Sequence, residues 1–146
     1  MSVGEKDLLP GVIENLTGNV LFHGIQVKPG MPTMLSVVKG TPVLSLSGNP
    51  FAVEALFEVL AGGYLTDMEA GRYLQKNQMK ILKQTFVKTG KMKRIVKGRC
   101  DESGVYLPQI QKNGQLKNGI GSNCLVIFPE GERTYAEGEA VRVIRI

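Results

Sequence analysis

Residues Lys28–Tyr64 read KPGMPTMLSVVKGTPVLSLSGNPFAVEALFEVLAGGY and predict a strand, a tight turn and a helix, in that order. The apolar run Val43–Leu46 is short and stops at a Gly-Asn-Pro turn, which is typical of a buried strand. Within the turn, Asn49 is suited to cap a helix, and Pro50 would occupy the first helical position, where its missing N–H group is not needed. The apolar spacing then predicts a helix over residues 50–60.

The same stretch combines two features that attract anions. A helix start presents backbone N–H groups and the positive end of the helix dipole. Lys28 adds a cation from the Pro-Gly turn upstream. The spacing alone leaves two interpretations open, an anion site and a plain strand-to-helix turn with a solvated lysine.

The chain before this stretch predicts a further helix and strand. Leu8–Leu16 carries apolar residues at helical spacing, and Val20–Phe22 is a short apolar run. Strands that alternate with helices at this spacing indicate an α/β layer, which we assign to residues 1–65. A capping-box pattern at Thr66–Glu69 predicts a short linking helix within residues 66–77.

The character of the sequence changes after residue 77. Four strand-like runs are separated by turns rich in Gly and Asn, which predicts a small all-β barrel or sandwich over residues 78–146. The last run alternates valine with arginine, so one of its faces is expected to be buried. The segment Gln78–Val87 fits both a helix and a strand on its residues alone. The four runs are Lys93–Arg99, Val105–Ile110, Cys124–Phe128 and Ala140–Ile146.

Length and composition exclude several classes of protein. The 146 residues suffice for one ordinary domain or two small ones. No apolar run approaches the ~20 residues of a membrane span, and Met1–Asp7 lacks the basic and apolar regions of a signal peptide. We therefore expect a cytoplasmic protein without membrane contact. Cys100 and Cys124 stand far apart, which predicts buried thiols and indicates neither a metal site nor a disulfide.

The net charge of +5 is concentrated in one part of the chain. Residues 66–100 contain ten Lys or Arg and two acidic residues, a net charge of +8. A nucleic-acid patch is one interpretation, but the interleaved aromatic residues of a single-strand platform are lacking, so nucleic-acid binding is not favoured. Five of these basic residues could instead face a substrate cleft or form a solvated strand face. They are Lys91, Lys93, Arg94, Lys97 and Arg99.

The ordered motifs of the chain resemble the C-terminal part of the molybdopterin molybdenumtransferase family, the MoeA family, to which the gephyrin E domain belongs. The resemblance covers nearly the whole chain. It rests on Ser2-Val3-Gly4 followed by Asp7, on Lys28-Pro29-Gly30, on Ser47-Gly48-Asn49-Pro50 and on Phe128-Pro129-Glu130-Gly131 after a basic link. The order of the Lys-Pro-Gly and Gly-Asn-Pro motifs is the most specific part.

For the fold, the resemblance implies the last part of a three-layer α/β molybdopterin-binding domain, joined to the family's C-terminal β-barrel domain. It also implies that Gln78–Val87 is mainly strand. The family's proteins are larger, so the chain is expected to be part of a longer protein. The apolar faces that the remaining domains cover would make this chain alone marginally stable, or would pair it with another copy. The family works as a dimer, so a homodimer is expected.

For the function, the resemblance implies insertion of molybdate into adenylylated molybdopterin with release of AMP, in a reaction that needs Mg2+. Lys28 would contact an anion, and Asp7 would be an acidic site residue that binds the metal or lies near the substrate. The loop that approaches the pterin would be shaped by Gly48, Asn49 and Pro50. Ser2, Gly4, Pro29 and Gly30 would complete the molybdopterin-binding positions.

Two departures from the family pattern support an alternative function. The family usually has a second lysine where this chain has Met31, and a proline where it has Ser47. Loss of a lysine that binds phosphate costs on the order of 1–3 kcal/mol, the scale of a charge-assisted hydrogen bond. The alternative is a diverged, non-catalytic module that binds a pterin or a protein partner.

Overall fold

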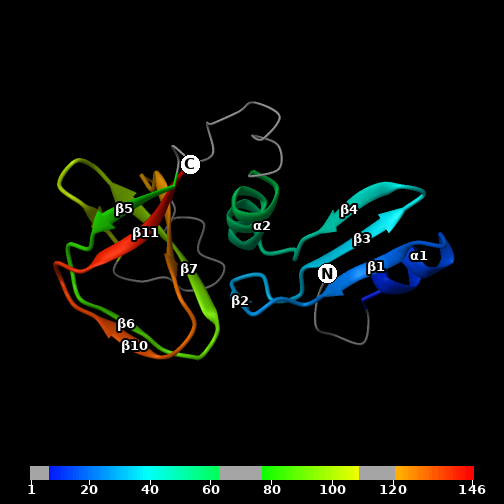
Figure 1. The fold of residues 1–146 in the computed structure, drawn as a ribbon, viewed down its shortest axis with the longest axis horizontal. Helices are drawn as coiled ribbons and strands as arrows, with labels where there is room; N and C mark the ends of the chain where they lie inside the picture. Colours follow the sequence, from blue (N-terminus) through cyan, green and yellow to red (C-terminus); the bar gives the residue numbers. More distant parts are fainter. Residues whose placement is uncertain (1–6, 63–76, 109–120) are drawn as a thin grey trace.

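The computed structural model describes residues 7–62, 77–108 and 121–146, which form a mixed α/β fold made mostly of strands (Figure 1). This confirms the predicted fold class. The first part contains α1 (Leu9–Asn15), β1 (Asn19–His23), β2 (Val27–Lys28), β3 (Met34–Val38), β4 (Thr41–Ser45), α2 (Pro50–Leu56) and a π-helical turn, η1 (Phe57–Ala61). The second part contains β5 (Asn77–Ile81), β6 (Phe86–Lys88), β7 (Lys93–Cys100), β8 (Val105–Tyr106), β9 (Cys124–Phe128), β10 (Arg133–Tyr135) and β11 (Ala140–Arg145).

The first part is built on a three-stranded antiparallel sheet with the order β1-β3-β4. Its hairpin turns at Lys39 and Gly40, whose φ angles of 49° and 80° suit the twist of a tight hairpin. The expectation of a buried strand at Val43–Leu46 is met only in part: Ser45 is buried and the other three residues are half-buried. Among the described residues, β4 lies at the edge of this sheet and begins with exposed Thr41 and Pro42. An edge position tolerates Pro42, which has no N–H group to donate.

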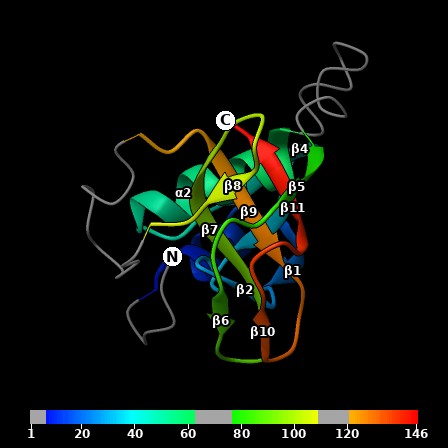
Figure 2. The ribbon, with the colours of Figure 1, turned by 90° about the vertical axis from the view of Figure 1, so that its left-hand side faces the viewer.

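The second part is organised around a six-stranded sheet with the order β2-β7-β9-β11-β5, in which β8 also pairs with β7. A single bridge between Leu82 and Val105 brings the chain after β5 back to β8. Figure 2 shows β6 and β10 as a separate two-stranded ladder below this sheet. The strands within the described residues form no closed barrel. Sheet curvature nevertheless encloses a core that includes Val96, Val126 and Phe128.

Most of the expected strands are present. β9 matches its predicted bounds, and β11 buries Val141 and Val143 while Arg142 is exposed, as the alternation indicated. The segment 78–87 is mainly strand, as the resemblance implied, because β5 and β6 occupy most of it. β10 was not expected. It is only three residues long, and Arg133 and Thr134 are exposed, so its apolar pattern is weak.

The two parts of the chain are packed against each other through α2 (Figure 1). Ala55 and Leu56 of α2 lie in one apolar cluster with Ile95, Leu125 and Ile144 of the sheet. β2 adds a second connection, because it pairs in parallel with β7. The predicted linking helix at 66–77 lies almost wholly outside the described residues, and the division into domains stays a prediction.

No helix in the described ranges is long and apolar enough to cross a membrane.

Candidate functional site

The Lys-Pro-Gly motif forms a tightly packed turn directly after β2. The Lys28–Pro29 peptide bond is cis, and Gly30 has a φ of +107°, a conformation that favours glycine. A Cβ atom on Gly30 would lie 2.0 Å from Cδ1 of Leu56, so the turn can touch α2 only with glycine there. The buried Thr33 hydroxyl donates a hydrogen bond of 2.7 Å to the carbonyl oxygen of Gly30. Packing against Leu56 and the hydrogen bond from Thr33 therefore fix the turn together.

The pairing of β2 with β7 brings Lys28 to the basic part of the chain. Lys28 lies opposite Arg94, and the N–H of Lys93 donates to the carbonyl oxygen of Gln26 at 3.1 Å. A cleft of about 300 Å³ opens at this junction. Its lining residues are Gln26, Lys28, Thr89, Gly90, Lys91, Met92 and Arg94.

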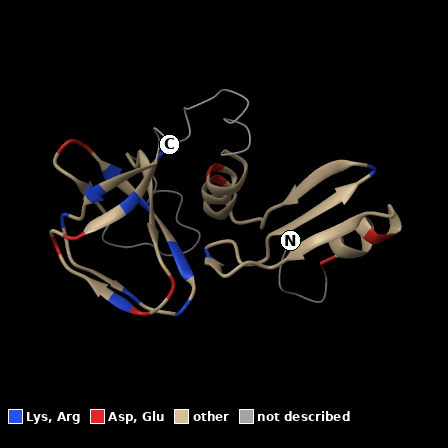
Figure 3. Ribbon diagram, in the orientation of Figure 1, with Lys and Arg blue, Asp and Glu red and all other residues tan. Residues whose placement is uncertain are grey.

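The charged residues that line this cleft are all cationic. Lys28, Lys91 and Arg94 contribute three positive charges, and its seven lining residues include no Asp or Glu. Figure 3 shows the basic end of β2 next to the basic start of β7. Side chains of one sign that converge on a concave surface raise the local concentration of counter-ions. The cleft is thus suited to an oxyanion or a phosphate group, with Thr89 as a neutral hydrogen-bonding partner.

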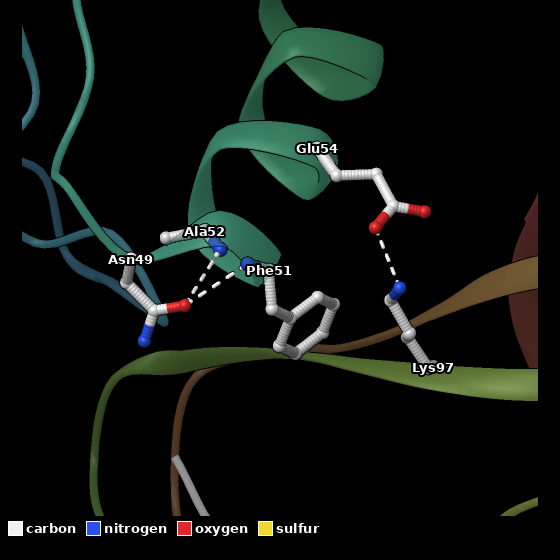
Figure 4. Close-up of polar contacts among 5 residues, drawn as sticks. All are labelled: Asn49, Phe51, Ala52, Glu54 and Lys97. Atoms are coloured by element: carbon white, nitrogen blue, oxygen red, sulfur yellow. Dashed lines mark hydrogen bonds and ion pairs between the residues drawn. The ribbon is translucent and has the colours of Figure 1, made fainter. Parts of the chain in front are cut away.

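The Gly-Asn-Pro turn has a clear local function. The Oδ1 atom of Asn49 accepts hydrogen bonds from the N–H groups of Phe51 at 3.0 Å and Ala52 at 3.3 Å (Figure 4). Asn49 is therefore the N-cap of α2, as predicted, and Pro50 is its first residue. Because the cap already satisfies two N–H groups, the helix start offers fewer free donors to an anion than its sequence indicated. Gly48, Asn49 and Pro50 do not line the cationic cleft.

The basic residues of β7 divide into different environments. Lys91 and Arg94 line the cleft, whereas Lys93 and Arg99 are exposed. The Nζ atom of Lys97 lies 2.5 Å from Oε2 of Glu54 and 5.4 Å from the centre of the Phe51 ring (Figure 4). Lys97 therefore connects β7 to α2 through an ion pair and a cation–π contact. Neither a substrate cleft nor a solvated strand face therefore describes all five basic residues from Lys91 to Arg99.

Asp7 precedes α1 and is not among the residues that line the cleft. Its Oδ1 atom accepts a hydrogen bond of 3.2 Å from the N–H of Leu9. In the parts of the chain that the structure describes, no three His, Cys, Asp or Glu residues converge as a metal-binding group. These residues therefore form no dedicated metal cage, whereas Mg2+ usually combines one or two carboxylates with waters and substrate phosphates. Ser2 and Gly4 lie outside the described residues.

The two cysteines are buried and not joined by a disulfide, which confirms the predicted buried thiols. Burial and the neighbouring Cys100 thiol raise the pKa of Cys124 to about 12. The Cys124 thiol is therefore protonated at neutral pH, and a protonated thiol is a poor nucleophile and a poor metal ligand.

Sequence reasoning missed part of the cleft. Thr89, Gly90 and Met92 belong to no recognisable motif. Gln26 lines the cleft mainly because it is close to Lys28 in the chain. The parallel pairing of two residues of β2 with β7 leaves no local pattern in the sequence. The one usable signal was the group of cations at the start of β7.

The chain is similar to known proteins over almost its whole length. Residues 1–67 match the family model described as a probable molybdopterin binding domain. The molybdopterin molybdenumtransferase of Staphylococcus aureus strain COL is 27% identical over 99% of this chain and 36% of its own length. That of Staphylococcus epidermidis strain ATCC 12228 is 24% identical with the same coverage. The chain thus spans about a third of the length of these relatives.

Solved structures support the same relationship. A molybdopterin biosynthesis MoeA protein from Pyrococcus horikoshii superimposes with a TM-score of 0.78 and 29% identity, over 95% of this chain and 34% of that one. A molybdenum cofactor biosynthesis protein from Pyrococcus furiosus superimposes with a TM-score of 0.67 and 24% identity, over 88% of this chain and 45% of that one. The second likeness concerns the fold alone.

Proposed function

The chain resembles the C-terminal part of the molybdopterin molybdenumtransferases in sequence and in fold, and from this premise we propose that it is the anion-binding and C-terminal part of such an enzyme. The proposed reaction inserts molybdate into adenylylated molybdopterin and releases AMP. The observation that carries the proposal is the convergence of Lys28 with Lys91 and Arg94 on one cleft. Both substrates of the proposed reaction are anions.

In this proposal the cleft binds the oxyanion or a phosphate oxygen of the nucleotide. Lys28 is the central cation, because its backbone is fixed by the turn that packs on Leu56. Arg94 offers a planar group that can donate two parallel hydrogen bonds to one anion, and Lys91 adds a point charge. Cleavage of a phosphoanhydride depends largely on such positioning and neutralisation of charge.

The remaining predicted site residues have supporting roles in the proposal. Gly48, Asn49 and Pro50 form a turn whose shape is set by the Asn49 cap, and we propose that this turn approaches the pterin. Pro29 and Gly30 would hold Lys28 in place. Asp7 would supply a single carboxylate, and waters and substrate phosphate oxygens would supply the remaining ligands of Mg2+. We derive no reaction step through the metal.

The exposed apolar surface of α1 and β1 supports the proposed association with a second copy. Leu8, Val12 and Leu16 lie on one side of α1 at helical spacing, and Val20 and Leu21 follow in β1. All five side chains are between 41% and 78% exposed. An apolar surface of this kind marks an association site in many proteins. We propose that the protein acts in the cytoplasm as a homodimer, with no membrane or nucleic-acid partner.

A second candidate function is a non-catalytic module that binds a pterin or a protein partner. The observation that favours it is Met31, which occupies the position of the family's second lysine. Its side chain is half-buried, and its carbonyl oxygen accepts the N–H of Ile25 at 2.9 Å, so this position is part of the packed turn. The Lys-Pro-Gly turn consequently has one cation fewer than the family pattern would supply, although Met31 itself does not line the cleft.

One assay separates the two functions. The protein is mixed with adenylylated molybdopterin, molybdate and Mg2+, and AMP release is followed by chromatography while pterin binding is followed by fluorescence. Release of AMP supports the enzyme. Binding of the pterin without release of AMP supports the non-catalytic module. Absence of both release and binding contradicts the enzyme and the pterin-binding module, and leaves only a module that binds a protein partner.

A further inference from the structure

Lys88 is the largest fully buried side chain, with a relative exposure of 1%. Lysine is almost never buried to this extent unless its ammonium group has hydrogen-bonding partners, because removing a charge from water is costly. Lys88 ends β6, and the β6–β7 loop that follows it (residues 89–92) lines the cationic cleft.

The hydrogen bonds of Lys88 reach two different loops. Its Nζ atom donates to the carbonyl oxygen of Gly90 at 2.8 Å and to the carbonyl oxygen of Gly131. The first acceptor belongs to the β6–β7 loop, and the second to the turn between β9 and β10. The buried ammonium group therefore joins the cleft loop to the neighbouring β9–β10 turn.

Two further hydrogen bonds reinforce this connection. The N–H of Gly90 donates to Oε1 of Glu132 at 3.1 Å. The N–H of Gly131 donates to the carbonyl oxygen of Lys91 at 2.8 Å. Gly90 is thus held through both its N–H and its carbonyl oxygen, and Lys91 through its carbonyl oxygen. Gly90 has a φ of +89°, so the loop bends sharply at the point where these bonds meet.

We propose that Lys88 and Glu132 are positioning residues that hold the β6–β7 loop so that Lys91 faces Lys28 across the anion cleft. The inference rests on the proposed function, since it concerns the affinity of the same cleft. Neither residue touches the anion. Both recorded acceptors of Lys88 are carbonyl oxygens rather than carboxylates, so its positive charge also adds to the cationic field behind the cleft.

The test uses sodium molybdate as the probe and calorimetry to measure its affinity for the 146-residue chain. Lys88→Met keeps the length and the apolar stem of the side chain but removes all three donors. Its affinity is expected to fall by roughly tenfold, because anion binding would then also have to order the β6–β7 loop and the Lys91 side chain. Glu132→Ala is expected to bind molybdate roughly three- to fivefold more weakly than Glu132→Gln, since both variants lack the carboxylate charge but only Gln keeps an acceptor oxygen for Gly90.

A stability control distinguishes positioning from simple destabilisation. Val141→Ala removes two methyl groups from the same core without touching the loop, and is expected to lower the melting temperature while leaving the affinity for molybdate intact. Amide hydrogen exchange provides a second readout that needs no ligand. Exchange at Gly90 and Gly131 is expected to rise by roughly tenfold in Lys88→Met, and not in Val141→Ala.

The outcomes are distinct for the inference and for the proposed function. If wild-type protein binds molybdate and Lys28→Ala weakens binding, but Lys88→Met and Glu132→Ala behave like Val141→Ala, the inference is overturned and the proposed cleft stands. If neither the wild-type protein nor any variant gives a measurable heat of molybdate binding, the proposed cleft and the inference are both overturned. If Lys88→Met fails to fold, the Glu132 pair decides the matter.

Discussion

Lys28 and Arg94 lie opposite each other in the parallel pairing of β2 with β7, although one belongs to the first part of the chain and the other to the second. This pairing creates the only direct strand contact between the two parts that the described residues contain. The pairing places Lys28, which directly precedes a turn, beside the basic strand β7. Together they form one concave surface whose charged residues are cationic. The proposed function depends on this relationship more than on any single motif.

Lys28→Ala is expected to weaken binding of molybdate or pyrophosphate by roughly tenfold or more, because it removes the central charged donor of the cleft. Isothermal titration at low ionic strength measures the change. Lys39→Ala is the matched control, since it removes the same charge from the exposed β3–β4 turn. Equal affinities for the two variants would exclude Lys28 from the site.

Met31→Lys is expected to raise the anion affinity, because it restores the second cation of the family's Lys-Pro-Gly motif, three residues after Lys28. The gain should be about 1 kcal/mol or more, since it introduces one charge-assisted interaction. Met31→Gln provides a polar control without charge. If the two variants bind equally well, the missing charge does not explain a loss of activity. An increase of AMP release in Met31→Lys alone would favour the enzyme over the non-catalytic module.

Gly30→Ala is expected to destabilise the fold by roughly 2–4 kcal/mol. The methyl group meets Leu56 at 2.0 Å, and the φ of +107° is unfavourable for alanine. Gly40→Ala has a φ of +80° but meets no atom within 4 Å, so it should cost only about 1–2 kcal/mol. Urea unfolding measures both. A double variant with Leu56→Ala should recover part of the overlap cost, and a Gly30→Ala cost no larger than that of Gly40→Ala would contradict the packing argument.

The Cys124 thiol is expected to make stability depend on alkaline pH. Its pKa is raised from 9.0 to about 12 by burial and by Cys100, so the native state favours the protonated thiol. The resulting stabilisation is fully present below about pH 9 and is lost as the pH rises from 9 towards 12. Urea unfolding at a series of pH values tests this. Cys124→Ala should flatten the decline over this range, and an unchanged decline would assign it to other groups.

An element of the fold could be predicted where residues close together in the sequence determine it. Asn49 and Pro50 carry the start of α2 in their own chemistry, a side-chain acceptor and a fixed φ angle, and the structure shows that start. β9 is apolar at every position, so its bounds were also evident. β4 has a similar composition but lies at an edge of its sheet, and composition does not indicate which neighbours cover a strand.

The sequence by itself determined the order of the elements, the N-cap of α2, the burial of both cysteines and the likeness to one family, because these depend on residues close together or on motif order. Only the tertiary structure decided that Lys28, Lys91 and Arg94 share one cleft, that Lys97 instead binds Glu54, and that Lys88 is buried behind the loop. These relationships depend on strand pairing and packing between distant segments, whose free energy is not encoded in any short stretch of the chain. The Lys-Pro-Gly turn is present in the sequence, but its partners are brought to it only by folding.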